Sequence, residues 1–201
     1  MKKGVLSVVI LVFMVLVTAV ASAKPIVIGV ATDTQILDGF ATIRGLKLAA
    51  EEINAAGGVN VAGERRPFKI EIIDTRDCEP GVPVSEALLV MEKIILDKGA
   101  DFVIGPSRSE AAIAALGIIS QYKKIYLSTC GCLSPAFHKS IAKDYDKFKY
   151  AFRITGEAAR MVGEAIDLLD IFNSKYGMNK MFVLVQDVGF ARAGGDIVAK
   201  K

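Results

Sequence analysis

The chain has 201 residues, of which 52% are hydrophobic and 23% are charged, and its formal net charge is +3. At about 150 residues per domain, this length allows one domain with a remainder. The small net charge gives no reason to expect nucleic acid or an anionic membrane surface as a partner. After the first 23 residues, no stretch is long and apolar enough to span a bilayer.

Residues 1–23 show the three regions of a secretory signal peptide. Two lysines precede an apolar run that ends at Val20, and an A-x-A cleavage site ends at Ala23. An uncleaved anchor is the alternative, but the run is shorter than the roughly 20 residues that a span needs. We therefore expect a periplasmic protein, cleaved after Ala23, in which residues 24–201 carry a formal charge of +1.

Four strand-like segments then alternate with helices. The strand patterns cover residues 25–30, 68–74, 102–104 and 124–128. Helical periods between them cover residues 43–56, 84–96 and 111–122. Such alternation, with short loops, predicts an α/β fold with a doubly wound parallel sheet and right-handed crossovers.

The remainder of the chain is less regular. Residues 129–149 lose periodicity and are interpreted as a long loop, followed by a short strand-like crossover at 150–154. An amphipathic helix is expected over 157–176, a buried strand over 180–186, and a helix from Phe190 onward. This last strand and helix have no partners in the sequence.

The turn after the third strand is a candidate binding site. Gly105-Pro106 ends the strand, and Ser107 and Glu110 have the spacing of a capping box. Ligands bind beyond the carboxyl ends of parallel strands, where a helix N-terminus favours a carboxylate. Ser109 would then have its hydroxyl in the first helical turn, within reach of a ligand. The alternative is that both serines only satisfy backbone groups.

The three cysteines are Cys78, Cys130 and Cys132, an odd number for an exported protein. Cys130 and Cys132 lie near His138, the only histidine, which suggests zinc. Their spacing is not a standard one, so a thiol pair in a loop is the preferred interpretation. We expect no metal and no cofactor.

Enzyme motifs are missing from the sequence. No Gly-x-Gly-x-x-Gly follows a strand, and no Walker loop occurs. The series Gly105-x-Ser107-x-Ser109 is not a Gly-x-Ser-x-Gly nucleophile elbow. We therefore do not expect an enzyme.

Several short motifs occur in a characteristic order. They are Ile28-Gly29-Val30, Arg44-Gly45, Glu52-Ile53-Asn54-Ala55-Ala56-Gly57-Gly58-Val59, Asp77-Cys78-Glu79-Pro80, Phe102-Val103-Ile104-Gly105-Pro106, Ser134-Pro135, Phe152-Arg153 and Asp187-Val188-Gly189-Phe190. After a signal peptide, this series resembles the type I periplasmic solute-binding proteins of the branched-chain amino acid (Leu/Ile/Val) family, which serve ABC importers. The resemblance runs from Lys24 to the end.

The resemblance implies two α/β lobes that close on an amino acid or a related amide, with the membrane permease of an importer as partner. Residues 24–151 would form the first lobe, and 152–201 the crossover and the start of the second. The family's ligand-binding serine falls on Ser109, and an aromatic residue of the second lobe falls on Phe190. The loop after the fourth strand, which also contacts ligand, falls on Thr129, Cys130, Gly131 and Cys132.

The sequence departs from the family pattern at several positions. Asp38 stands where an aromatic residue commonly covers the ligand; it could favour a cationic or amide-bearing ligand, or cap the first helix. The family's first-lobe disulfide would join Cys78 to position 108, which is Arg108 here. In the family's strand order the second and fourth strands are three spacings apart, roughly 14 Å, whereas a disulfide needs Cα atoms within about 7 Å, so we expect Cys78 to form no disulfide with the later cysteines.

The second lobe is incomplete in the sequence, which ends at Lys201. We therefore hypothesise a truncated product or a gene fragment with weakened affinity. A ligand-sensing receptor lobe of the same fold and a non-functional fragment are the alternatives to a transport component.

Overall fold

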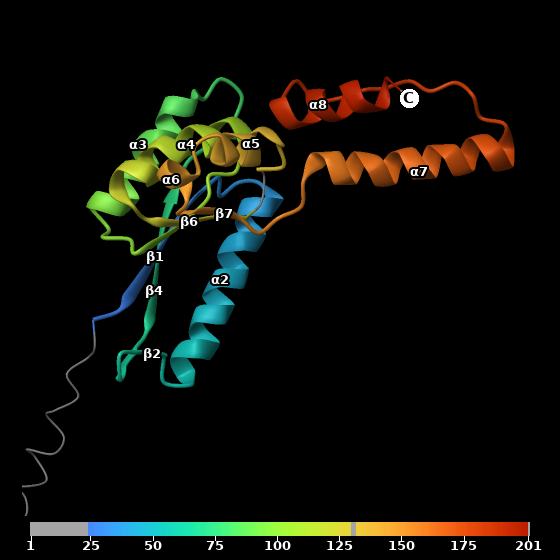
Figure 1. The fold of residues 1–201 in the computed structure, drawn as a ribbon. Helices are drawn as coiled ribbons and strands as arrows, with labels where there is room; N and C mark the ends of the chain where they lie inside the picture. Colours follow the sequence, from blue (N-terminus) through green and yellow to red (C-terminus); the bar gives the residue numbers. More distant parts are fainter. Residues whose placement is uncertain (1–23, 130–131, 201) are drawn as a thin grey trace, which may run out of the picture.

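The computed structural model describes residues 24–129 and 132–200 (Figure 1). The main sheet contains β1 (Ile26–Thr32), β4 (Phe68–Asp74), β5 (Phe102–Ile104), β6 (Ile125–Ser128) and β7 (Ala151–Arg153). The helices are α2 (Leu37–Ala55), α3 (Val84–Leu96), α4 (Ser109–Tyr122), α5 (Ala136–Lys143), α6 (Tyr145–Phe148), α7 (Ala158–Tyr176) and α8 (Gly189–Val198). A separate hairpin, which was not predicted, joins β2 (Val59–Val61) to β3 (Glu64–Arg66).

The strands of the main sheet are all parallel and lie in the order β4-β1-β5-β6-β7. Within β1, Val30 pairs with Ile72 of β4 on one side and with Ile104 of β5 on the other. The chain therefore leaves β1 in one direction and later returns past it, which creates a topological switch point between β1 and β5. This order confirms the predicted doubly wound parallel sheet.

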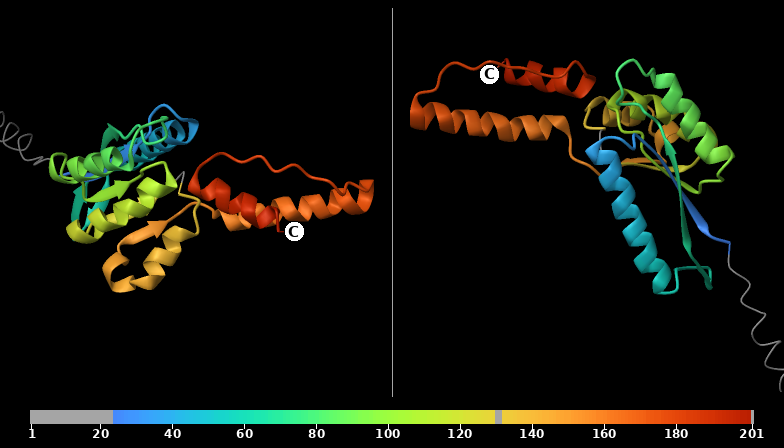
Figure 2. Two further views of the ribbon diagram at one scale, coloured as in Figure 1. Left: turned by 90° about the horizontal axis from the view of Figure 1, so that it is seen from above. Right: turned by 180° about the vertical axis from the view of Figure 1, so that it is seen from behind.

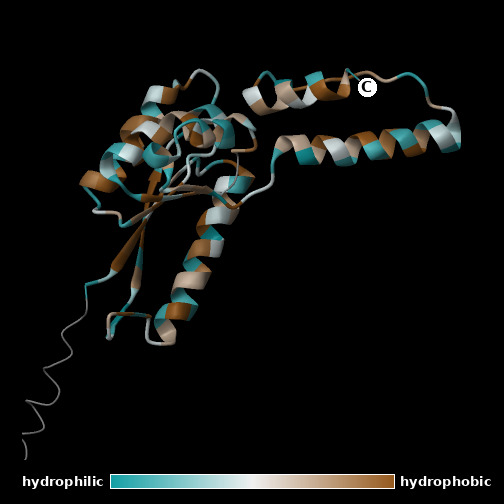
Figure 3. Cartoon of the chain, in the orientation of Figure 1, coloured by the Kyte–Doolittle hydropathy of each residue, from teal (hydrophilic) through white to brown (hydrophobic). Residues whose placement is uncertain are grey.

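The helices cover both faces of the sheet. The helix α2 lies on one face, where it packs against β4, and α3 and α4 lie side by side on the other (Figures 1 and 2). The best-buried side chains lie between α3, α4, α5 and the strands; they include Met91, Ile94, Val103, Leu116, Ile119, Tyr126 and Phe137. β1 is predominantly hydrophobic in Figure 3, as expected of a strand buried on both faces.

Gly29 shows how closely α3 approaches β1. A Cβ atom added at Gly29 would lie 2.7 Å from the Cβ of Ala100 and 2.9 Å from Cγ1 of Ile94. No side chain fits in that space, so the motif Ile28-Gly29-Val30 is explained by the packing of α3 directly on the strand backbone.

The prediction of one long loop over residues 129–149 was wrong, because α5 and α6 form within it. Phe137 of α5 is fully buried, and its ring packs edge-on against Tyr126 with the centroids 6.1 Å apart. The charged residues that suggested a loop are exposed on the outside of these short helices. Phe137, together with Ile141 one turn later, thus packs this short helix against the core.

The chain after β7 forms a pair of helices, α7 and α8, that extends away from the sheet (Figures 1 and 2). Both helices were predicted. The buried strand predicted over residues 180–186 is wrong, since that segment forms no strand and leaves Phe182 and Leu184 88% and 85% exposed. A buried strand needs hydrogen-bonding neighbours, and the described residues hold no second sheet beside this segment.

In the described part of the chain, no helix is both long enough and apolar enough to cross a bilayer.

Candidate functional site

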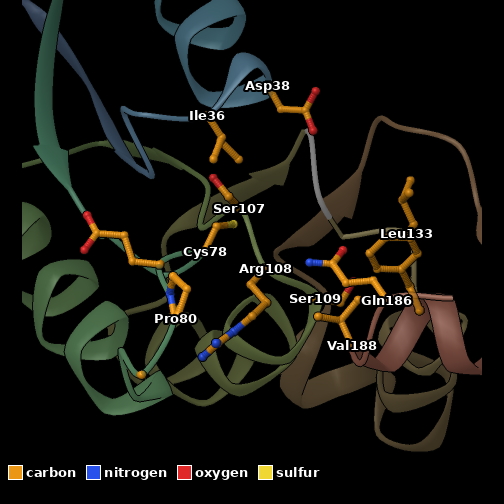
Figure 4. Close-up of a pocket in the computed structure, with 13 residues that line it drawn as sticks. Ile36, Asp38, Cys78, Pro80, Ser107, Arg108, Ser109, Leu133, Gln186 and Val188 are labelled. Carbon is orange, nitrogen blue, oxygen red and sulfur yellow. The ribbon is translucent and has the colours of Figure 1, made fainter.

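A cavity of about 470 Å³ opens at the carboxyl ends of the parallel strands (Figure 4). This volume lies within the range of about 300–1,000 Å³ that is typical of small-molecule sites. The walls come from the loops after β1, β4 and β5 and from the segments before α5 and α8. Polar side chains on these walls include Asp38, Glu79, Ser107, Arg108, Ser109 and Gln186. The apolar ones include Ile36, Leu133, Val188 and Phe190.

The loops after β1, β4 and β5 are joined by a closed ring of hydrogen bonds. Asp33 accepts one at Oδ2 from the N–H of Cys78, at 3.0 Å. Asp77, beside Cys78, accepts one at Oδ2 from the N–H of Arg108, at 2.6 Å. Ser107, beside Arg108, accepts one at Oγ from the N–H of Asp33, at 3.1 Å, which closes the ring. Three chain segments are thereby held in one arrangement.

Both carboxylates of this ring are completely buried. Their second oxygens are also used, because Asp33 Oδ1 accepts from the N–H of Gln35 at 2.9 Å and Asp77 Oδ1 accepts from the hydroxyl of Thr75 at 2.5 Å. Asp33, Asp77 and Cys78 bring potential metal-ligand atoms within 4.8 Å of one another. Since all four carboxylate oxygens already bind the chain, we assign this cluster a structural role.

The predicted capping box at the start of α4 is wrong. The residue at the N-cap position is Arg108, and its side chain makes no capping hydrogen bond. Ser107 Oγ instead lies 2.7 Å from the hydroxyl oxygen of Thr32 and accepts from the N–H of Asp33. Glu110 is directed to Gly189 at the start of α8. Both residues are therefore used in tertiary contacts in place of the local cap.

Three of the predicted ligand-binding residues line the same cavity. Ser109 is the first residue of α4 and is 1% exposed. Asp38 lies in the first turn of α2, whose N-cap is Ile36, so of the two alternatives for Asp38 the capping role is ruled out. Phe190 enters from α8, 81 positions after Ser109 in the sequence. Figure 4 shows Asp38 and Ser109 coming from different elements around the cavity.

Two of the four residues predicted in the loop after β6, Thr129 and Cys132, belong to the described part of the chain. Cys130 and Gly131 lie outside the described residues. Thr129 follows β6 directly but is not part of the cavity wall. Cys132 is fully buried in the hydrophobic core, and this burial raises the pKa of its thiol to about 11. Its neighbour Leu133, which was not predicted, lines the cavity instead.

Charged groups of both signs surround the cavity. Glu79 is bound by Arg76 through two nitrogens, at 3.1 Å and 2.7 Å, and this hydrogen bonding keeps the pKa of Glu79 below its ordinary value. Arg108 donates from Nη2 to the carbonyl of Val82 at 3.4 Å. The cavity wall thus carries charged groups of both signs, of which Glu79 is already paired with Arg76.

Further wall residues had a usable signal in the sequence. Glu79, Pro80 and Gly81 follow β4, and the rule that ligands bind at the carboxyl ends of parallel strands would have included them. Gln186 and Val188 follow in the same way from the end of the strand predicted over 180–186, and Val188 also stands in the motif Asp187-Val188-Gly189-Phe190.

Solved structures similar to this chain share its fold at low sequence identity. An ABC transporter substrate-binding protein from Desulfitobacterium hafniense is 23% identical with a TM-score of 0.63; the match covers 88% of this chain and 47% of that one. A branched-chain amino acid transporter substrate-binding protein from Streptococcus pneumoniae, in complex with isoleucine, is 22% identical with a TM-score of 0.56, covering 76% and 39%. A solute-binding protein of an ABC transporter from Rhodopseudomonas palustris, in complex with 3,4-dihydroxybenzoic acid, is 15% identical with a TM-score of 0.60, covering 88% and 43%.

The chain thus spans less than half of the length of these three proteins. A comparison with curated proteins gave no significant match. A family model described as "Periplasmic binding protein" matches residues 25–201, which is nearly the whole chain. The order of the strands, the cavity at their carboxyl ends and this match agree, and the chain belongs to the periplasmic binding protein family.

Proposed function

We propose that this protein is the extracytoplasmic solute-binding component of an ABC importer, and that its cavity binds an amino acid of the branched-chain type or a related amide. The observation that carries the proposal is the convergence of Ser109, Asp38 and Phe190 on one cavity beside the topological switch point. In open α/β sheets this is the place where ligands bind. No catalytic step is proposed.

The arrangement supports a specific orientation of the ligand. Its carboxylate would lie at the N-terminus of α4, where backbone N–H groups and the Ser109 hydroxyl favour negative charge. Its ammonium or amide N–H would lie near the carboxylate of Asp38. Its side chain would pack against the apolar part of the wall, which is formed by Leu133, Val188 and Phe190.

The class of ligand follows from the two charges that the cavity can accommodate. The Streptococcus pneumoniae relative holds isoleucine, and the Rhodopseudomonas palustris relative holds 3,4-dihydroxybenzoic acid. Both ligands carry a carboxyl group, which is consistent with the role proposed for the start of α4. Only an amino acid also brings an ammonium group, and Asp38 is the residue that would select for it.

A thermal-shift screen tests this proposal. The panel contains leucine, isoleucine, valine, glutamine, arginine, urea and 4-hydroxybenzoate, followed by calorimetric titration of the compounds that raise the melting temperature. Saturable binding of an amino acid or amide supports the proposal. Binding of 4-hydroxybenzoate alone, or of no compound in the panel, would contradict it.

Matched variants locate the site. Ser109→Ala should weaken binding about 3- to 10-fold, which corresponds to the loss of one hydrogen bond. Asp38→Asn should weaken binding of an amino acid about 10- to 100-fold, because a hydrogen bond to a charged group is lost. Ser120→Ala is the control; Ser120 lies on the same helix, with its hydroxyl bonded to the carbonyl of Gly117, and should leave affinity unchanged.

Export is the second part of the proposal. Residues 1–23 would direct the protein to the periplasm, and cleavage after Ala23 would leave Lys24 as the first residue. Intact mass of the exported protein measures this directly. A permease in the membrane would then take the ligand from the bound form.

A further inference from the structure

Glu110 links two parts of the chain that are far apart in sequence. It lies in the first turn of α4, and its Oε1 accepts a hydrogen bond at 2.7 Å from the N–H of Gly189, 79 positions later. Gly189 is the first residue of α8, and the side chain of the N-cap residue Val188 makes no capping hydrogen bond. The carboxylate of Glu110 therefore takes the place of a local cap and faces the positive end of the α8 dipole.

This hydrogen bond joins two walls of the cavity. Ser109, which precedes Glu110, lines the cavity from α4. Val188 and Phe190, which flank Gly189, line it from the other side. Any movement of α8 away from α4 would break the bond and widen the cavity at the same time.

Glu110 also has a second partner within reach. Its Oε2 lies 3.9 Å from Nε of Arg108, too far for a hydrogen bond. Among the described residues, both of these atoms are buried and have no hydrogen-bond partner. A shift of about 1 Å would bring the two groups within hydrogen-bonding distance. Glu110 thus makes one hydrogen bond to α8 through Oε1 and only a longer ion-pair contact with Arg108 through Oε2.

We propose that Glu110 is a two-position latch that controls how α8 closes over the cavity. In the closed position its carboxylate caps α8 and holds Val188 and Phe190 against the cavity. In the open position α8 leaves, and Glu110 pairs with Arg108, so that Oε2 and Nε, which lack hydrogen-bond partners in the closed position, bind each other. Glu110 acts as a positioning residue, and this role holds whether or not the cavity takes an amino acid.

Hydrogen exchange at the Gly189 amide tests the latch without any ligand, because this amide is the donor of the bond. Glu110→Gln keeps the size of the side chain but removes its charge, and should raise exchange at Gly189 about tenfold. Gly189→Ala places a Cβ 2.9 Å from Glu110 Oε1 and should raise the exchange of the same amide while Glu110 is intact. Glu86→Gln is the control, since Glu86 holds the equivalent place in the first turn of α3.

Arg108→Gln tests the second position. Without Arg108 the carboxylate of Glu110 has no partner in the open position, so the closed position becomes more populated. Exchange at the Gly189 amide should therefore slow by about twofold or more. Unchanged exchange in Glu110→Gln, or an equal rise in Glu86→Gln, would overturn the latch. Unchanged or faster exchange in Arg108→Gln would overturn the open position. Circular dichroism of each variant establishes that the fold is intact.

Discussion

Replacing Asp77 with alanine should separate the loops that form the cavity, because both hydrogen bonds to the buried carboxylate are lost. The N–H of Arg108 and the hydroxyl of Thr75 would then be left without their acceptor. Each buried donor without a partner costs about 1–3 kcal/mol. Removal of the buried charge recovers part of this cost. We expect the free energy of unfolding to fall by about 3 kcal/mol.

Asp77→Asn distinguishes hydrogen bonding from charge. The amide oxygen of asparagine can still accept from the N–H of Arg108, and its NH₂ group can donate to the hydroxyl of Thr75, which is free to rotate. Only the contribution of the charge to these bonds is lost. We expect a decrease of about 1 kcal/mol, clearly smaller than for alanine.

Urea unfolding followed by circular dichroism measures both variants against the parent protein. Asp146→Ala is the control, because the Asp146 side chain is 95% exposed and its removal should change the free energy of unfolding by less than about 0.5 kcal/mol. Equal losses for alanine and asparagine, or a loss below about 1 kcal/mol for alanine, would refute the argument that the ring of hydrogen bonds holds the loops.

Two further predictions concern packing and pH. Gly29→Ala should destabilise the protein by about 1–3 kcal/mol, because the new Cβ would lie 2.7 Å from that of Ala100, whereas Gly45→Ala, on α2 with open space around it, should stabilise it by about 0.5–1 kcal/mol; urea unfolding measures both. Burial raises the pKa of the Cys132 thiol from 9.0 to about 11, so the unfolded chain loses this proton first as pH rises. Stability that is present below pH 9 should therefore fall by about 2 kcal/mol between pH 9 and 11, and this decrease should be absent in Cys132→Ala.

The sheet and its main helices could be predicted because each strand is a short apolar run between turn residues, and each helix has a regular period. The same kind of signal failed for residues 180–186. An apolar run forms a buried strand only where neighbouring strands can pair with it. Among the described residues, no strand lies beside residues 180–186. The helix α5 was missed for a different reason: Phe137 and Ile141 lie one turn apart and pack against the core, but the segment is short and charged residues follow it.

The position of the cavity followed from a general rule about parallel sheets, and the predicted Asp38, Ser109 and Phe190 all lie on its wall. The details of its support could not be predicted. Ser107 and Glu110 have the spacing of a local cap, but their actual partners are Thr32 and Gly189, 75 and 79 positions away. A local pattern carries no information about such distant competitors.

A structure of the protein crystallised with the tightest-binding compound of the panel tests the central claim most directly. Our account predicts ligand density between Asp38, Ser109 and Phe190, with the carboxylate of the ligand at the N-terminus of α4. Density at any other place on the molecule, or a ligand in this cavity with its carboxylate directed toward Asp38, would contradict the account.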